Sequence, residues 1–336
     1  MSSWWTSSMA HKKTVLRVTV LLAVLAAVLS ICVGAVTVPP GDLLAALTGK
    51  STGTGTAIVL YVRLPRTVGC LVSGAALAVA GVVIQTVLAN PLASPNVIGI
   101  NAGAGAAVAL CCAVAPTVVG ITPVAAFLGA FGSAMLVLAI SQRAGSSRMT
   151  LILTGVALSS IFSALVDLVV TLAPDALNGY SDFRVGGLGS VTMARVGPAA
   201  AVGLICLAGV LLLTNELDVL ALGSETARSL GLRVGKMRVI LLALAAGLAG
   251  AAVSVSGLIG FVGLIVPHLI RRFLGEESRP LVIGCAFGGA ALLTVCDTAA
   301  RTLFAPYEIP VGVVLSLGGG PFFIWLLLRQ KGGRRR

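Results

Sequence analysis

The stretch TVGCLVSGAALAVAGVVIQTVLA, residues 67–89, decides the fold class of this chain. It holds 23 residues and not one charged side chain. About 20 predominantly apolar residues in an α-helix are enough to cross the hydrocarbon core of a bilayer. We therefore predict that residues 67–89 form a membrane-spanning helix.

Runs of the same kind repeat along the chain. The first follows Lys12, Lys13 and Arg17 and is longer than the apolar region of a signal peptide, so we interpret it as an uncleaved first helix. The eighth is short and contains Pro267, which predicts a kinked helix sheltered by protein. The sequence thus predicts an all-α membrane protein with about ten transmembrane helices, Val18–Val38, Thr67–Ala89, Val97–Ala115, Thr122–Ile140, Thr150–Leu172, Val196–Thr214, Met237–Val255, Ile259–Phe273, Leu281–Ala300 and Val311–Leu328.

The composition supports the same conclusion. Of the 336 residues, 57% are hydrophobic and 10% are charged, and the mean hydropathy is +1.06. A soluble domain carries about 25% charged residues, so this chain cannot cover a water-facing surface. A soluble enzyme, a disordered chain and a free nucleic-acid binder are excluded. The net charge of +12 lies in short clusters between apolar runs, which is typical of loops at an anionic membrane face.

The distribution of basic residues predicts the orientation. An even number of spans places both termini on one side of the membrane. With the N-terminus inside, 17 basic residues fall on inside segments and 6 on outside segments, as the positive-inside bias requires. We therefore expect a multi-pass protein of the cytoplasmic membrane. Residues 1–17 would form a cytoplasmic segment, 18–328 the transmembrane domain and 329–336 a basic cytoplasmic tail.

The sequence offers no catalytic centre. Residues 49–51, GKS, resemble the end of a phosphate-binding loop, but Leu44 stands where that loop needs its first glycine. No HExxH or CxxC motif is present, and the seven cysteines lie in or beside apolar runs. We predict no cofactor, no metal site and no ATPase site in this chain. If ATP drives it, another subunit supplies the hydrolysis.

Arg63-Leu64-Pro65-Arg66 is predicted at the outer mouth of the second span, where Pro65 would set a local turn. Two interpretations stay open for its arginines. They could snorkel to the membrane interface, or they could dock an acidic partner from outside, because guanidinium groups pair well with carboxylates.

Polar residues follow the second span. Residues 90–96, NPLASPN, predict a turn because they contain two prolines and two asparagines. This segment is either a structural turn or the lining of a central water-filled path, to which Asn101 in the next span would also belong.

Two carboxylates lie within apolar spans. Asp297 precedes Arg301 by four residues, so the two can neutralise one another on a helix. Asp167 has no obvious local partner, and no role is assigned to it.

Residues 215–236, NELDVLALGSETARSLGLRVGK, form the longest polar stretch predicted inside. We expect Ser224 to cap a short helix that runs through Leu230 and ends at Gly231. An idle connection would not need this amphipathic pattern. The segment is therefore predicted to be a docking surface for a motor subunit.

Several motifs together resemble one family. RLPR at residues 63–66 is followed by GAALAVAGVVIQTVLANPLASPNVIGINAGA from residue 74, ARSLGL from 227, GLIGFVGLIVPHLIRR from 257 and EIPVGVVLSLGGGPFFIWLLLR from 308. These motifs, spread over about residues 63–329, resemble those of FecCD-type permeases of ATP-binding-cassette (ABC) importers for iron chelates, haem and cobalamin.

The resemblance implies a type II ABC importer permease bundle. It would work with a second permease subunit, two cytoplasmic ATPase subunits and an extracytoplasmic substrate-binding protein, in a lipid bilayer and without nucleic acid. The sites that it implies are binding-protein docking by Arg63, Arg66 and Arg301, ATPase coupling by Leu217, Leu220, Gly223, Glu225, Ala227, Leu230 and Gly231, and a translocation path or gate at Gln85, Asn90, Asn101, Ser146, Ser147 and Thr150.

The function expected from this resemblance is the translocation of an iron-siderophore-type chelate. The sequence does not distinguish hydroxamate, catecholate, haem and cobalamin cargoes, nor an identical from a different partner permease. One alternative is a proton-driven secondary carrier that has no ATPase partner and uses Asp167 as a relay. Another is an intramembrane enzyme, but the sequence contains no HExxH motif and no paired catalytic carboxylates. The amphipathic segment inside favours the motor-driven importer.

Overall fold

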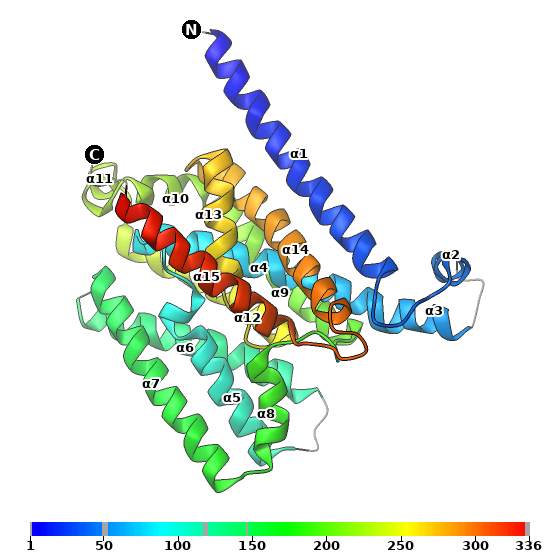
Figure 1. The fold of residues 1–336 in the computed structure, drawn as a ribbon. Helices are drawn as coiled ribbons and strands as arrows, with labels where there is room; N and C mark the ends of the chain where they lie inside the picture. The colour runs from blue at the N-terminus through cyan, green and yellow to red at the C-terminus, as the bar shows by residue number, and fades with distance from the viewer. Residues whose placement is uncertain (1, 49–52, 117–119, 146, 333–336) are drawn as a thin grey trace.

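The computed structural model describes residues 2–48, 53–116, 120–145 and 147–332, and within these ranges the chain is helical and contains no β-strand (Figure 1). Figure 1 shows a bundle in which α1 leans against one side and the short helices α2 and α3 lie beyond its C-terminal end. The helices are α1 (Ser2–Cys32), α2 (Pro40–Thr48), α3 (Thr54–Ile58), α4 (Leu64–Leu88), α5 (Ile100–Val114), α6 (Ile121–Arg143), α7 (Arg148–Leu172), α8 (Ala176–Val185), α9 (Met193–Leu212), α10 (Thr214–Ala221), α11 (Ser224–Ser229), α12 (Val234–Ser256), α13 (Val262–Leu274), α14 (Ser278–Thr302) and α15 (Val311–Gly332).

Each predicted span corresponds to a helix, but the helices differ in length. In the described part of the chain, seven helical stretches are long and apolar enough to cross a membrane. The other three predicted spans are α15 and the shorter helices α5, of 15 residues, and α13, of 13 residues. Pro267 lies inside α13 and is buried, so this proline helix is sheltered by protein as expected.

Helix α4 forms the centre of the bundle. Nineteen of its 25 residues are buried, and α1, α9, α12, α13 and α14 all contact it. Its small residues allow this close packing, since neighbouring helices in lipid associate through van der Waals contact and not through a hydrophobic drive. A Cβ atom on Gly74 would overlap the backbone of Gly289 in α14, and one on Gly81 would overlap the backbone of Gly263 in α13.

The RLPR motif does not make the predicted turn. The helix runs without a break from Thr54 to Leu88, through a π-helical segment at Val59–Arg63. Pro65 occupies the first turn of α4, where a proline is tolerated because the π-helical register has already changed the hydrogen-bond pattern. The expectation of a turn was wrong, and Arg63 and Arg66 therefore lie one helical turn apart.

The two ends of the bundle carry different contacts. At one end, Lys12 of α1 pairs with Glu277, and the Asp218 carboxylate of α10 accepts a hydrogen bond from the Ser278 backbone N–H at 2.8 Å. At the other end, Arg63 and Arg301 contact the C-terminal turn of α1. Helices α10 and α11 lie at the first end (Figure 1).

The connection between α7 and α9 holds a helix that the sequence did not predict. Residues 173–195 fall between two predicted spans and were not expected to contain a helix, but Ala176–Val185 form α8, which packs against α5. The sequence did not predict this helix because the segment has low hydropathy and the prediction followed apolar runs.

Candidate functional site

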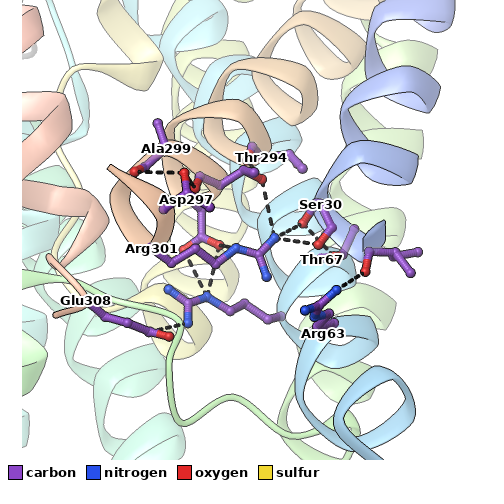
Figure 2. Close-up of polar contacts among 12 residues, drawn as sticks. Ser30, Arg63, Thr67, Thr294, Asp297, Ala299, Arg301 and Glu308 are labelled. Atoms are coloured by element: carbon purple, nitrogen blue, oxygen red, sulfur yellow. Dashed lines mark hydrogen bonds and ion pairs between the residues drawn. The ribbon is translucent and has the colours of Figure 1, made fainter. Parts of the chain in front are cut away.

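A buried network of charges joins α4, α14 and the C-terminal turn of α1 (Figure 2). Its centre is Asp297 of α14, which is fully buried. Arg66 donates from Nε to both carboxylate oxygens of Asp297, at 3.1 and 2.9 Å, and from Nη1 to Glu308 Oε2 at 2.7 Å. Arg301 Nε lies 3.7 Å from Asp297 Oδ2, so the predicted (i, i+4) pair is confirmed.

The other contacts of the network lead to α1. Arg301 donates from Nη2 to the Ser30 carbonyl and hydroxyl oxygens, and the Ser30 hydroxyl is 2.7 Å from that of Thr67. Arg63 donates to the carbonyls of Ile31 and Cys32, both at 2.8 Å. These carbonyls belong to the last turn of α1 and have no partner within the helix, so Arg63 acts as a cationic C-cap.

The three arginines are therefore buried, although both interpretations of the RLPR motif require exposed arginines. Arg63, Arg66 and Arg301 are each about 3–5% exposed, because helix geometry directs them toward α1 and α14. A buried guanidinium needs a partner, and each finds one inside this chain. Their role in docking stays a prediction. Of the three, Arg66 also lines a cavity of about 490 Å³, together with Arg195 and Glu308.

At the opposite end, residues 214–229 form two short helices where we expected one. Leu217, Leu220 and Ala227 point inward and are 0–3% exposed. The outward side chains of Leu222 and Leu230 are 63% and 62% exposed. The segment is amphipathic, as predicted.

Two glycines allow the sharp turns of this segment. Gly223 and Gly231 have φ values of +103° and +85°, which L-residues rarely adopt. The cap is not the predicted one. Gly223 is the N-cap of α11, and the Ser224 hydroxyl accepts a hydrogen bond from Arg238 Nη2 at 2.6 Å. A contact with α12 has thus replaced the local cap.

The residues predicted for a path or gate do not gather at one place. Gln85 is buried, donates to the Gly263 carbonyl at 3.0 Å and accepts from Arg271, so it joins α4 to α13. Asn90 Oδ1 accepts from the Leu92 backbone N–H at 2.9 Å and stabilises the turn after α4. Gln85 and Asn90 line one cavity of about 550 Å³ with His268 and Arg271.

The remaining gate residues lie at the start of α7. The Ser147 hydroxyl accepts a hydrogen bond from the Thr150 backbone N–H at 3.0 Å, so Ser147 is the N-cap of α7. Ser146 lies outside the described residues.

Asn101 lies in a different cavity, of about 510 Å³, between α5, α7 and α8. Its side-chain oxygen is buried and accepts no hydrogen bond from any described residue. Asp167 of α7 and Tyr180 and Arg184 of α8 also line this cavity. Burial raises the pKa of Tyr180, so its phenol stays protonated near neutral pH.

Sequence reasoning missed several of these residues. Glu308, Ser30 and Thr67 complete the network around Asp297, and Tyr180 and Arg184 complete the cavity at Asn101. For Glu308 and Arg184, the only available signal was a charged residue near an apolar span. Ser30, Thr67 and Tyr180 gave no signal, because their partners are distant in sequence. Among the described residues, no group of three or more His, Cys, Asp and Glu side chains could hold a metal ion.

The family follows from a match that spans nearly the whole bundle. A family model described as the FecCD transport family matches residues 21–329. The chain belongs to the FecCD transport family. Its helices and its motifs are therefore those of a multi-pass transport permease of ABC-type import systems, as the resemblance implied.

The relatives of this FecCD member include permeases named for different cargoes. It is 41% identical over 281 residues to the hemin transport system permease protein of Yersinia pestis, which covers 82% of this chain and 84% of the relative. It is 37% identical over 309 residues to a permease protein of the Fe(3+) dicitrate transport system of Escherichia coli K12, with 89% and 92% covered. It is 37% identical over 314 residues to a vitamin B12 import system permease protein of another E. coli strain, with 92% and 93% covered.

A solved structure has the same fold. It is described as an inward-facing conformation of a metal-chelate type ABC transporter. The TM-score is 0.82 at 29% sequence identity, and the match covers 94% of this chain and 99% of that one. The helical arrangement of this FecCD member is thus that of an ABC transporter.

Proposed function

We propose that this chain is the membrane-spanning permease subunit of an ABC importer that carries an iron-siderophore-type chelate across the cytoplasmic membrane. It would pair with a second permease subunit, receive cargo from a substrate-binding protein outside and be driven by two ATPase subunits inside. The chain itself performs no chemistry. A bulky hydrated chelate cannot cross lipid, but it can cross between bundles that open alternately.

The α10–α11 segment is the observation that carries this proposal. Two short helices with buried Leu217 and Ala227 present the exposed Leu222 and Leu230 at the predicted cytoplasmic end. Exposed apolar side chains outside the lipid are typical of a protein–protein contact. A carrier driven by protons alone would not need such a surface.

The segment is also joined to the transmembrane helices. Asp218 of α10 caps the N-terminus of α14 through the Ser278 backbone N–H, and Arg238 of α12 holds Ser224. A carboxylate at a helix N-terminus is favourable because it faces the positive end of the helix dipole. Movement of α10 and α11 by an ATPase would therefore be passed to α12 and α14.

The predicted docking and gating roles form part of the proposal. Arg66 lines a cavity at the outer end, where a partner's acidic side chain could reach it, and Arg63 and Arg301 hold the helices around it. At the inner end, Ser147 and Thr150 begin α7, and Gln85 and Asn90 line a cavity. These residues are candidates for an inner gate.

A pair of substitutions tests the coupling role. Ala227 is fully buried, so Ala227→Asp would disturb the fold and is not a clean probe. Leu222→Asp and Leu230→Asp change exposed side chains. We expect each to abolish ATP-driven uptake and to weaken ATPase binding, with unchanged thermal stability. The control is Val114→Asp, which is 77% exposed at the C-terminal end of α5, a helix that does not pack against α10 or α11. Normal uptake in both leucine variants would contradict the proposal.

The proton-driven alternative rests on Asp167. It is an exposed carboxylate in a membrane-spanning helix and makes no ion pair with the described residues. Proteoliposomes separate the two functions. An importer takes up chelate with ATP and no proton gradient, and needs the ATPase and the binding protein. Uptake by the chain alone, driven by a proton gradient and lost in Asp167→Asn, would establish the carrier instead.

A further inference from the structure

One face of α7 carries a polar stripe that a lipid-facing helix would not have. Ser159, Ser163, Asp167 and Thr171 follow one another at four-residue spacing, so they share a face of the helix. Ser163, Asp167 and Thr171 are exposed in this chain. An exposed carboxylate in a membrane-spanning helix has to face water or a polar ligand.

Two adjoining cavities lie along this stripe. The cavity between α5, α7 and α8 has a volume of about 510 Å³. A second cavity of about 520 Å³ lies beside it and is lined by Asn96 and by the hydroxyls of α7. Ser163 and Asp167 line both cavities. Asp167 therefore stands where the two meet.

The cavity between α5, α7 and α8 contains groups that call for a ligand. The Asn101 side-chain oxygen is buried and unpartnered among the described residues, so it needs a donor from a water molecule or a cargo. The Tyr180 hydroxyl reaches the same space from α8. Asp167 and Arg184 are the charged residues of its lining, and their charges sum to zero.

Because the charges of its lining cancel, this cavity should bind neutral complexes better than anionic ones. A polyanionic complex that entered would lose hydration and would find no excess positive charge to compensate it. It would also meet the Asp167 carboxylate at the join of the two cavities. A neutral complex carries no such penalty and can use the hydrogen-bonding groups.

From this charge balance we propose that the cavity between α5, α7 and α8 is a cargo subsite for an electrically neutral chelate, such as a ferric trihydroxamate complex. The Asp167 carboxylate repels anionic complexes, and the Arg184 guanidinium offsets that charge only as far as neutrality. This inference rests on the proposed import function. It names the charge class of the cargo and two residues that determine specificity.

The test compares two probes on the purified permease with its ATPase in nanodiscs. The probes are a neutral ⁵⁵Fe trihydroxamate complex and anionic ⁵⁵Fe citrate, and the readout is the ratio of their dissociation constants by equilibrium binding. We expect wild type to prefer the neutral complex. Asp167→Asn should reduce that preference about tenfold, since a carboxylate at the join no longer repels the anion. Arg184→Gln should increase the preference.

Asp175→Asn is the matched control, because Asp175 is exposed beside α8 and lines none of the cavities described above. It should leave the ratio unchanged. The same ratio in wild type, Asp167→Asn and Asp175→Asn would overturn the subsite, as would tighter binding of citrate to wild type. Asp167→Glu keeps the charge and should keep the preference, which separates a charge effect from misfolding.

A second readout distinguishes the inference from the function on which it rests. In proteoliposomes that contain the complete importer, ATP-dependent uptake of either complex by wild type supports the import function. If wild type transports but the Asp167→Asn variant shows an unchanged cargo ratio, the subsite alone is wrong. If wild type transports neither complex while nanodisc binding shows the expected ratio, the subsite stands and the import function is wrong.

Discussion

Helices α4 and α7 have the same length and almost the same hydropathy, yet they occupy opposite environments. In the most apolar part of the stretch that contains α4, 78% of the residues are buried, against 22% for α7. The two helices differ in the size and polarity pattern of their side chains, which the mean hydropathy does not distinguish. Small residues line α4 where α13 and α14 meet it, whereas α7 carries large apolar residues and a polar stripe. Hydropathy marks a span, but the size and pattern of its residues determine what surrounds it.

The largest expected effect is on the close contact between α4 and α13. Gly81→Leu should prevent folding, because a Cβ atom there would overlap the Gly263 backbone, which cannot move away cheaply. The measurement is recovery of monodisperse protein by size-exclusion chromatography in detergent. Gly132→Leu on α6 is the control, since no atom lies within 4 Å of a Cβ at that position. Equal recovery of both variants would show that α4 is not tightly enclosed.

The next largest effect is expected for the buried charges between α4 and α14. Asp297→Asn should lower the free energy of unfolding by about 3–5 kcal/mol, because it leaves Arg66 and Arg301 without their shared carboxylate. The check is unfolding in mixed micelles with increasing denaturing detergent. The exposed Asp175→Asn should show no measurable change. A stable Asp297→Asn protein would mean that water reaches this network.

A matched pair of leucines compares the two helices directly. Leu77 of α4 is 2% exposed and Leu153 of α7 is 61% exposed. Leu77→Ala should cost about 2–5 kcal/mol through lost packing, and Leu153→Ala about 0.5 kcal/mol or less. The same micelle titration measures both. If Leu153→Ala proved as costly as Leu77→Ala, α7 would be covered by protein in the assembly.

The smallest expected change in stability is at the start of α7. Ser147→Ala should cost about 1 kcal/mol, because the Thr150 backbone N–H loses its cap. Hydrogen–deuterium exchange of the first turn should become faster. Ser160→Ala is the control, since its hydroxyl donates to the Val156 carbonyl within the same helix and does not cap the helix terminus. Unchanged exchange in the Ser147 variant would show that the cap does not hold this turn.

The expected spans and the amphipathic inner segment were visible in the sequence because they depend on local composition. A charge-free run of about 20 residues is costly in water and stable in lipid wherever it occurs. The pattern of residues 215–236 likewise predicted an amphipathic helical surface, although the structure divides it into α10 and α11. Helix α8 was not predicted, because a short polar helix has no periodic apolar pattern.

The partners of the charged residues could not be predicted. Arg66 and Asp297 are 231 positions apart in the sequence, and Arg301 and Ser30 are 271 apart. We expected exposed arginines because positive charge near a helix end usually reaches solvent or the interface. The packing of α1 and α14 against α4 instead encloses them. No local pattern encodes such an enclosure.

By itself, the sequence determined that the chain crosses a membrane many times and that its motifs are those of an importer permease. The membrane spans follow from the free energy of transferring short apolar segments from water into lipid. The family follows from motifs that are contiguous in the sequence. The tertiary structure decided which span lies at the centre, where the arginines point and which polar groups share a cavity. Those outcomes depend on contacts between helices that are far apart along the chain, and lipid, being as apolar as the spans, does not determine them.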